Sequence, residues 1–228
     1  MPELGTVIVT GGASGLGAAV AHAVAERGGE PVVMDVNPPQ NGFAFEGVDL
    51  SQTRAAEAAV ERVAQERGGI DAVVTAAGVD ACGRIEDVGA DEWERVVAVN
   101  LLGTAAVIRA ALPQLGRAGG RVVTVASTLG LRALSDATAY CASKFGVIGF
   151  SRALAAETAG RVGVTCLIPG GMQTSFFEGR PEQYKPPPDV ALAPPARVAE
   201  TVIFALTRPA GVELRELVVC PPTESSWP

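Results

Sequence analysis

The sequence predicts an α/β fold with a doubly wound parallel sheet of about seven strands, covered by helices on both faces in three layers. Short apolar runs rich in valine alternate along the chain with longer helix-prone segments. Most of the strand candidates are apolar throughout, as strands buried on both faces are. The chain has 228 residues, of which 48% are hydrophobic. This length suits one well-buried domain and is short for two, so we expect residues 1–228 to form a single domain.

The strand and helix candidates alternate in chain order. Strands are expected at residues 6–10, 31–35, 43–49, 70–76, 121–126, 162–168 and 216–220. Helices are expected at residues 18–27, 53–67, 91–115, 138–159 and 196–207. The proline-rich stretch 171–195 is predicted to be an irregular lid, semi-rigid because proline restricts φ. In such folds the ligand binds at the carboxyl ends of the strands, so we expect the site there.

Charge and cysteine content exclude several classes of function. The net charge is −7, from 18 basic and 25 acidic residues, which argues against binding to nucleic acid or an anionic membrane. No segment reads as a signal peptide, and no run reaches the ~18 apolar residues that span a bilayer. We therefore expect a cytoplasmic protein. The four cysteines show neither zinc-site nor disulfide spacing, so no metal is expected; they are Cys82, Cys141, Cys166 and Cys220.

A glycine-rich turn, T-G-G-A-S-G-L-G, follows the first strand over residues 10–17 and leads into a helix. Glycine lets the backbone turn sharply and approach a pyrophosphate, and a helix N-terminus offers free N–H groups to phosphates. The glycines at 11, 15 and 17 do not follow the commoner G-x-G-x-x-G spacing. In this context the turn nevertheless predicts a dinucleotide site.

Asp35 ends the second strand, 18 positions after Gly17. An acid at this place meets the ribose hydroxyls of an adenosine and repels a 2′-phosphate. Neither the glycine turn nor the residues just after Asp35 contain Arg or Lys. The sequence thus predicts NAD(H) rather than NADP(H). The alternative is an ordinary aspartate at a turn.

Tyr140 and Lys144 are four residues apart on a predicted helix and therefore share a face. An ammonium beside a phenol favours the phenolate, so this tyrosine could act as a general base or acid on an alcohol or a ketone. Ser127 follows the fifth strand and could hold the substrate oxygen. By itself, a Tyr-x-x-x-Lys pair is weak evidence for a catalytic site. Its position in the chain after the glycine turn and Ser127 strengthens the prediction.

Taken together, these motifs resemble the short-chain dehydrogenase/reductase family in its shorter, single-domain Rossmann-like form. The resemblance runs from Thr10 to about Thr174. The matching pieces are Thr10-Gly11-Gly12-x-x-Gly15-x-Gly17, Asp49-Leu50, Ala77-Gly78, Asn100, Ser127, Tyr140-x-x-x-Lys144 and Pro169-Gly170-x-Met172-x-Thr174.

The resemblance implies roles for these residues. Tyr140 would be the catalytic acid/base, with Lys144 lowering its pKa and binding the nicotinamide ribose. Ser127 would orient the substrate, and Asn100 would hold a water that relays protons. Asp49 and Leu50 would contact the adenine, and Met172 and Thr174 the carboxamide. The full set expected to bind the cofactor is Gly11, Ser14, Gly15, Leu16, Gly17, Asp35, Asp49, Leu50, Ala77, Gly78, Tyr140, Lys144, Pro169, Gly170, Met172 and Thr174. The family also implies a homodimer or homotetramer, formed by its long helices.

Two departures from the family pattern stand out. Thr75 and Ala76 replace the asparagines of the usual Asn-Asn-Ala-Gly, which puts in doubt the bracing of the central sheet more than the chemistry. Thr165 replaces an asparagine that often precedes the Pro-Gly turn, a change we read as neutral.

The substrate should be covered by the loop after Gly78, by residues 128–136 and by the lid. Three aromatic side chains of the lid could line an apolar pocket or simply pack the lid on the sheet; they are Phe176, Phe177 and Tyr184. Arg84 and Arg132 are the nearest cations in sequence, and either could meet an acidic substrate or stay solvated. His22, on the first helix, is expected to be structural or exposed.

The sequence therefore predicts an NAD(H)-dependent oxidoreductase that interconverts a secondary alcohol and a ketone. One alternative is a sugar-nucleotide epimerase or dehydratase, although such relatives normally carry an extra substrate domain. A second is a dinucleotide-sensing binding protein without catalysis, against which the presence of Ser127, Tyr140 and Lys144 argues. The substrate and the physiological direction are left open, with the NAD preference favouring oxidation.

Overall fold

The computed structural model describes residues 4–227. It contains a seven-stranded parallel sheet in the order β3-β2-β1-β4-β5-β6-β7, which confirms the predicted fold class. The strands are β1 (Thr6–Thr10), β2 (Glu30–Asp35), β3 (Ala44–Gly47), β4 (Ala72–Thr75), β5 (Arg121–Val125), β6 (Gly163–Pro169) and β7 (Glu216–Val219). The strand order reverses between β1 and β4, and this switch point opens the crevice in which such folds bind ligands.

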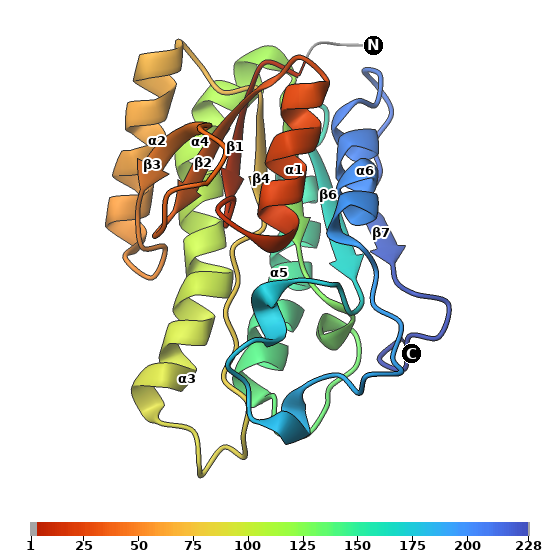
Figure 1. Cartoon of the computed structure of the whole chain (residues 1–228). Helices are drawn as coiled ribbons and strands as arrows, with labels where there is room; N and C mark the ends of the chain where they lie inside the picture. Colours follow the sequence, from red (N-terminus) through yellow and green to blue (C-terminus); the bar gives the residue numbers. More distant parts are fainter. Residues whose placement is uncertain (1–3, 228) are drawn as a thin grey trace.

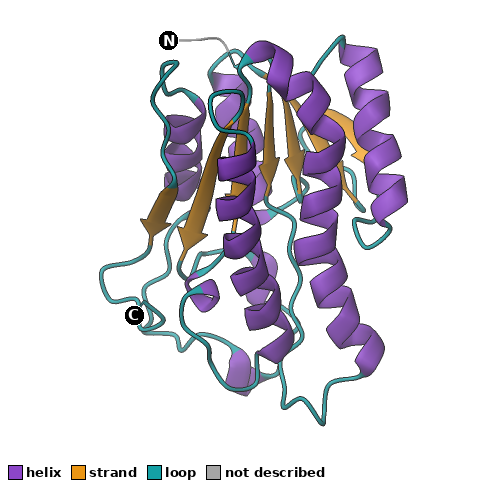
Figure 2. Cartoon of the chain, turned by 180° about the vertical axis from the view of Figure 1, so that it is seen from behind, coloured by secondary structure: helices purple, strands orange, loops and turns teal. Residues whose placement is uncertain are grey.

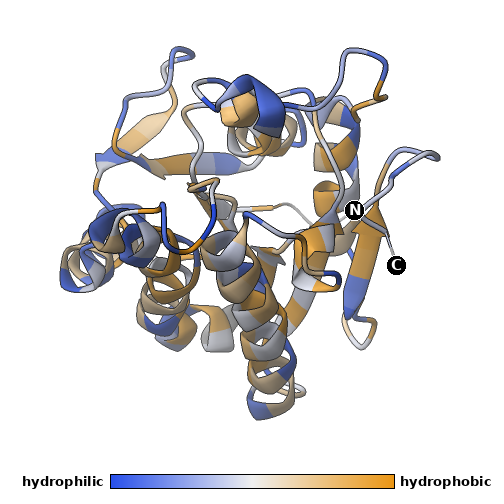
Figure 3. Cartoon of the chain, turned by 90° about the horizontal axis from the view of Figure 1, so that it is seen from below, coloured by the Kyte–Doolittle hydropathy of each residue, from blue (hydrophilic) through white to orange (hydrophobic). Residues whose placement is uncertain are grey.

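Helices cover both faces of the sheet in three layers (Figures 1 and 2). One face carries α1 (Gly15–Glu26) and α6 (Pro195–Leu206), and the other carries α2 (Thr53–Arg67), α4 (Thr104–Ala118) and α5 (Thr138–Glu157). Successive side chains of β1 enter opposite cores, because side chains alternate across a strand. Val7 and Val9 pack with α1 and α6, and Ile8 packs with α2 and α4. Both faces therefore need apolar residues, whereas polar residues gather on the loops and outer helical turns (Figure 3).

The long helix expected at residues 91–115 is continuous but not regular. It consists of α3 (Ala90–Val97), a π-helical turn η1 (Ala98–Gly103) and α4. A Cβ at Gly103 would lie 2.7 Å from the carbonyl oxygen of Leu50, so glycine permits the close approach of the two backbones. The π turn carries Asn100, and such turns often occur at functional positions.

By length and composition alone, the stretch Ala90–Gly116 could cross a membrane. Half of its apolar window is buried inside the protein. Val107, Ile108, Ala111 and Leu115 pack against the sheet, so this stretch is a core helix of the fold.

The carboxyl ends of the strands all meet the same cluster of loops, which lies at the lower end of the molecule in Figure 1. Three short 3₁₀ turns belong to this cluster: η2 (Thr128–Gly130), η3 (Ser175–Phe177) and η4 (Glu182–Tyr184). The last two lie within the proline-rich stretch 171–195. Its ends are paired, since Ala193 N–H donates to the Gly171 carbonyl (2.9 Å) and Gln173 N–H to the Ala193 carbonyl (2.9 Å). The stretch thus leaves β6, crosses this end of the sheet and returns before α6.

Candidate active site

The glycine turn between β1 and α1 lies at the switch point of the sheet. Gly11 has φ +68°, and a Cβ there would lie 2.6 Å from the Cα of Ala77. A Cβ at Gly17 would lie 2.2 Å from the Gly11 carbonyl oxygen. Both obstacles are backbone atoms, which cannot move aside without opening the turn. Only glycine therefore fits at these two positions, and the backbone surface of the turn stays open to a ligand.

The start of α1 provides donors for an anion. Ser14 is the N-cap, yet its side chain makes no capping hydrogen bond, and the first turn contains no acidic residue. The N–H groups of this turn have no intrahelical acceptors and stand at the positive end of the helix dipole. The residues present thus fit the pyrophosphate of a dinucleotide. Thr174, at the start of the lid, lies next to Gly15, since a Cβ there would be 3.4 Å from the Thr174 side chain.

Asp35 is fixed over the same turn. One carboxylate oxygen accepts the Ala13 N–H (3.1 Å) and the other accepts the Asn37 N–H (3.1 Å). The negative charge at the carboxyl end of β2 therefore has a defined position beside the glycines, as the sequence predicts.

Asp49 and Leu50 follow β3, which ends two residues earlier than expected, at Gly47. Asp49 accepts the Ser51 N–H (2.9 Å) and pairs with Arg95 (3.1 Å). Partial burial pushes up the pKa of Asp49, but the hydrogen bonds from Ser51 and Arg95 hold this pKa below its ordinary value. The Leu50 side chain is buried in the core between α2 and α4. Contact of these two residues with an adenine stays a prediction.

Ser127, Tyr140 and Lys144 gather at the carboxyl end of β5. Ser127 caps η2 by accepting the Leu129 N–H (3.1 Å), and its hydroxyl lies close enough to the Tyr140 phenol to lower the pKa of Tyr140. Lys144 Nζ lies 5.5 Å from the centre of the Tyr140 ring and donates to the Val125 carbonyl (2.9 Å). Tyr140 and Lys144 share a face of α5, as their spacing predicts. The strand-to-helix packing brings Ser127 to them.

The pKa values of the pair are shifted by burial. Burial raises the pKa of Tyr140 above its ordinary value, and the hydrogen bond with Ser127 opposes this rise. Burial also lowers the pKa of Lys144 to about 8, because an ammonium loses hydration there. The lowered phenol pKa expected from the Tyr-x-x-x-Lys spacing is therefore not found in this structure. The reason is that desolvation of the phenolate outweighs the neighbouring groups that favour it.

Both the oxygen and the nitrogen of the Asn100 side-chain amide are hydrogen-bonded within the protein. Its Oδ1 accepts the Val79 N–H (2.8 Å), and its Nδ2 donates to the Val79 carbonyl (2.9 Å) and to Ser143 Oγ (3.0 Å). Ser143 in turn donates to the Tyr140 carbonyl (2.8 Å). The side chain thus braces the loop after β4 against α5 beside the tyrosine. The water-holding role of Asn100 stays a prediction.

The departure at Thr75 has a structural cost. The Thr75 hydroxyl is buried in the middle of the sheet and has no hydrogen-bond partner among the described residues. Thr10 Oγ1 accepts the Ala77 N–H (3.1 Å) and supplies one link between β1 and the end of β4. Thr165 donates to the Leu214 carbonyl (2.6 Å), so this second departure has a bracing partner of its own.

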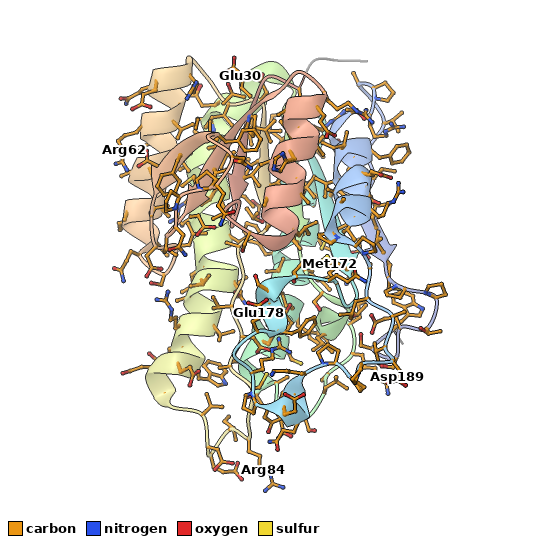
Figure 4. All side chains as sticks on the ribbon, viewed as in Figure 1. Glu30, Arg62, Arg84, Met172, Glu178 and Asp189 are labelled. Atoms are coloured by element: carbon orange, nitrogen blue, oxygen red, sulfur yellow. The ribbon has the colours of Figure 1, made fainter. Side chains whose placement is uncertain are left out.

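The lid brings an aromatic side chain to the tyrosine. The rings of Phe176 and Tyr140 are 5.6 Å apart, and Phe177 packs edge-on against Phe176 at 5.7 Å. Met172 packs instead with the core on the α1 and α6 side. Figure 4 shows Met172 and Glu178 on this segment, below the carboxyl ends of the strands.

The model of the family described as "short chain dehydrogenase" matches residues 5–185. The chain belongs to this family. It is therefore an oxidoreductase of the short-chain dehydrogenase type that acts on CH–OH groups, and its family implies a nicotinamide dinucleotide cofactor.

Several relatives are named dehydrogenases. D-threitol dehydrogenase of Mycolicibacterium smegmatis is 38% identical over 170 residues, which span 68% of this chain and 64% of that protein. D-beta-hydroxybutyrate dehydrogenase of Cupriavidus necator is 32% identical over 78% of this chain and 74% of its own length. An alcohol dehydrogenase from Thermococcus sibiricus, solved with 5-hydroxy-NADP, superimposes with a TM-score of 0.83 at 25% identity, covering 94% of this chain and 95% of that one.

Two groups of contacts near this dehydrogenase site could not be predicted from the sequence. Asp80, in the loop after β4, forms an ion pair with Arg180 of the lid at 2.6 Å. Glu224, in the tail after β7, accepts the Gly171 N–H (2.7 Å), and Ser226 hydrogen-bonds Thr128 (2.6 Å). None of these three contacts has a sequence signal, since the partners are 53 to 100 residues apart and each is an ordinary loop residue alone.

The two cations that are nearest in sequence lie elsewhere. Arg84 is exposed at the tip of the loop after β4, pairs with Glu86 at 3.6 Å and points away from the molecule (Figure 4). Arg132 donates to the Ser225 carbonyl (2.9 Å) in the tail. Both guanidinium groups therefore have partners outside the group formed by Ser127, Tyr140 and Lys144.

Two other features are remote from the tyrosine. His22 hydrogen-bonds Asn41 (2.9 Å) and packs edge-on against Phe43, so it is structural, as expected. A cavity of about 300 Å³ lies between α5 and the β6–β7 edge, and its lining includes Arg152, Cys166 and Glu216 but none of the predicted site residues.

Proposed function

We propose that this short-chain dehydrogenase interconverts a secondary alcohol and a ketone with NAD(H). The observation that carries the proposal is the gathering of Ser127, Tyr140 and Lys144 at the end of β5. The same sheet edge carries the glycine turn that fits a pyrophosphate. Proton-transfer groups and a dinucleotide cradle at one edge suit a reaction that moves a hydride and a proton together.

The glycine turn and the start of α1 would hold the pyrophosphate, and Asp35 the adenosine ribose. The nicotinamide, when bound, supplies or accepts the hydride. Asp35 supports NAD over NADP because its fixed carboxylate would repel a 2′-phosphate. Neither the glycine turn (residues 10–17) nor residues 36–42, just after Asp35, contain a Lys or Arg that could offset this charge.

The chain's own residues would manage the proton. Ser127 would hold the substrate oxygen beside Tyr140, since the Ser127 hydroxyl is near enough to the phenol to affect the pKa of Tyr140. Tyr140 would donate its proton to the oxygen during ketone reduction and take one during alcohol oxidation. The raised pKa keeps Tyr140 protonated, so the alcohol-oxidation direction requires positive charge beside the phenol. Lys144, held in place by the Val125 carbonyl, lies 5.5 Å from the centre of the ring and could supply this charge.

Tyr140→Phe tests this assignment because it removes only the hydroxyl. We expect kcat to fall about 10²- to 10⁴-fold while the Kd for NAD stays within about twofold. Turnover is followed by the absorbance of the reduced nicotinamide, with a panel of secondary alcohols and ketones that begins with D-threitol and D-β-hydroxybutyrate. Retained turnover in Tyr140→Phe would refute the assignment. A wild-type chain that binds NAD but turns over no substrate would favour a dinucleotide-sensing protein.

The cofactor preference has its own test. The value of kcat/KM with NAD should exceed that with NADP by more than about tenfold, because the Asp35 carboxylate repels the 2′-phosphate that only NADP carries. Asp35→Ser should lower this ratio mainly by improving the use of NADP. A wild-type preference for NADP would overturn the proposal.

We also propose that the enzyme is a cytoplasmic homodimer or homotetramer. Leu102 of η1 and Phe145 of α5 are about half exposed on adjoining helical segments, an apolar pair that a second copy would cover. The four cysteines in the described part of the chain are all free, as suits a reducing compartment. Light scattering of Phe145→Glu should show a smaller particle than the wild type, whereas an equal mass would contradict the interface.

A further inference from the structure

The ion pair between Asp80 and Arg180 is unusual in its burial. The Nη2–Oδ2 distance is 2.6 Å, and the two side chains are only 8% and 16% exposed. Most other ion pairs among residues 4–227 have at least one partner more than one-third exposed. Removing charges from water is expensive, so a buried pair persists only when its geometry and further contacts compensate for desolvation.

Both partners have such contacts. The Asp80 carboxylate also accepts the Ala81 N–H (2.8 Å) and the Cys82 S–H (3.3 Å). The Arg180 guanidinium stacks over the rings of Phe176 at 4.8 Å and Phe177 at 4.7 Å. It also donates to the Tyr184 carbonyl (3.4 Å). Arg180 thus joins η3, η4 and the loop after β4 through one side chain.

The Asp80–Arg180 pair is connected to Tyr140 through the ring of Phe176, on which Arg180 stacks. Phe176 lies between them, 5.6 Å from Tyr140 and under the guanidinium. The charges act directly as well: Asp80 raises the pKa of Tyr140 and Arg180 lowers it. Of the other charged or titratable groups, Cys141 raises this pKa, and Lys144 lies 5.5 Å from the ring.

Arg180 is also the cation that an anionic substrate would need. Arg84 is paired with Glu86, Arg132 donates to the Ser225 carbonyl, and Lys144 donates to the Val125 carbonyl. Of the two cations in residues 171–195, Lys185 pairs with Glu182, whereas the charge of Arg180 acts on Tyr140. The charge of Arg180 is already neutralised by Asp80. Asp80 contacts Arg180 through Nη2, whereas the buried Nε of Arg180 has no hydrogen-bond partner among the described residues. A substrate carboxylate would therefore have to compete with the negative charge of Asp80 for this guanidinium.

We propose that the Asp80–Arg180 pair is a specificity latch that holds the lid on Tyr140 and withholds Arg180 from the substrate, so that the site selects uncharged alcohols and ketones over anionic ones. Both residues are positioning residues in this scheme. The selectivity part rests on the proposed function, whereas the closure of the lid does not.

Lid closure is tested by limited proteolysis of the whole chain, with Asp80→Asn and Arg180→Met as single variants and as the double variant. Cleavage between residues 178 and 190 should become at least about tenfold faster in each single variant, because the lid loses its link to the loop after β4. The double variant should add little, since either change alone breaks the same contact. Arg180→Lys, which keeps the charge but not the planar stack, should recover part of the protection.

Arg84→Met is the matched control, because it removes an arginine of the same loop whose ion pair is exposed. Its lid cleavage should stay within about twofold of wild type. Circular dichroism of each variant shows whether the sheet is intact. If a folded Asp80→Asn and a folded Arg180→Met both keep wild-type protection, the latch is refuted.

Selectivity is tested with a matched substrate pair, a 3-hydroxy acid and its methyl ester, which differ in charge at one end. Wild type should prefer the ester, and Asp80→Asn should shift the ratio of kcat/KM values toward the acid by about tenfold or more because Arg180 becomes available. Arg180→Met should not show this shift. A wild-type preference for the acid, or an unchanged ratio in Asp80→Asn, would overturn the selectivity part.

The pH profile separates charge from mere loosening of the lid. For alcohol oxidation, the midpoint of the rise of kcat with pH should fall in Asp80→Asn and rise in Arg180→Met. A lid that only loosens would move both midpoints in the same direction or neither. If wild type turns over no alcohol or ketone, the proposed function fails while the proteolysis result still decides the latch.

Discussion

Thr75→Val should stabilise this protein, which is a rare outcome for a substitution in the middle of a sheet. Thr75 is 2% exposed in β4, between Thr10 of β1 and Thr124 of β5, and its hydroxyl has no partner among the described residues. Valine has nearly the same shape and keeps the branched Cβ that suits a strand. The change removes a hydroxyl whose burial without a partner costs about 1–3 kcal/mol. We therefore expect the free energy of unfolding to rise by about 1–2 kcal/mol.

The assay is urea unfolding followed by circular dichroism at one protein concentration, since association of copies would otherwise alter the apparent stability. With a slope of about 2–3 kcal/mol per molar urea, the midpoint should rise by roughly 0.5 M. Thr124→Val is the matched control, because the Thr124 hydroxyl is bonded to Ser151 at 2.6 Å. The control should lower the midpoint. A midpoint for Thr75→Val at or below that of wild type would refute the reasoning.

Three further predictions follow from the site. Gly17→Ala places a Cβ 2.2 Å from the Gly11 carbonyl oxygen, so the Kd for NAD, measured by calorimetry, should rise by more than about tenfold; an unchanged Kd would contradict the cradle. Lys144 has a pKa of about 8 in the fold, so between pH 8 and about 10.5 only the unfolded chain holds this proton. In urea unfolding, the free energy of unfolding of wild type relative to that of Lys144→Met should thus increase across this pH window. Parallel pH curves for the two proteins would contradict the lowered pKa of Lys144. Glu224→Ala leaves the Gly171 N–H without its acceptor, so carboxypeptidase should release the tail faster, as mass spectrometry would show; equal rates would argue against docking of the tail.

Residues whose roles depend on local spacing could be predicted from the sequence. The glycine turn needs only a strand before it and a helix after it, and the structure has both. Tyr140 and Lys144 share a face because four residues make about one helical turn, whatever surrounds the helix. Asp35 lies beside the turn because parallel strands end at a common edge.

Properties that depend on burial could not be predicted in this way. The pKa of Tyr140 rises rather than falls because desolvation of the buried phenolate outweighs the favourable groups around it. Likewise, the π turn that contains Asn100 occurs where Gly103, its last residue, lies against the backbone of Leu50. A sequence pattern reports which side chains face inward but not how completely water is excluded from them.

By itself, the sequence determined the order of strands and helices, the dinucleotide turn, the charge proposed to favour NAD and the residues proposed to move the proton. These features are encoded in periodicity and short spacing, which act before the chain has folded. Only the tertiary structure decided that Asp80 meets Arg180, that Glu224 reaches Gly171 and that the Thr75 hydroxyl is left unpaired. Contacts between residues so far apart in the chain depend on how the loops cross at the edge of the sheet, and no local pattern records that crossing.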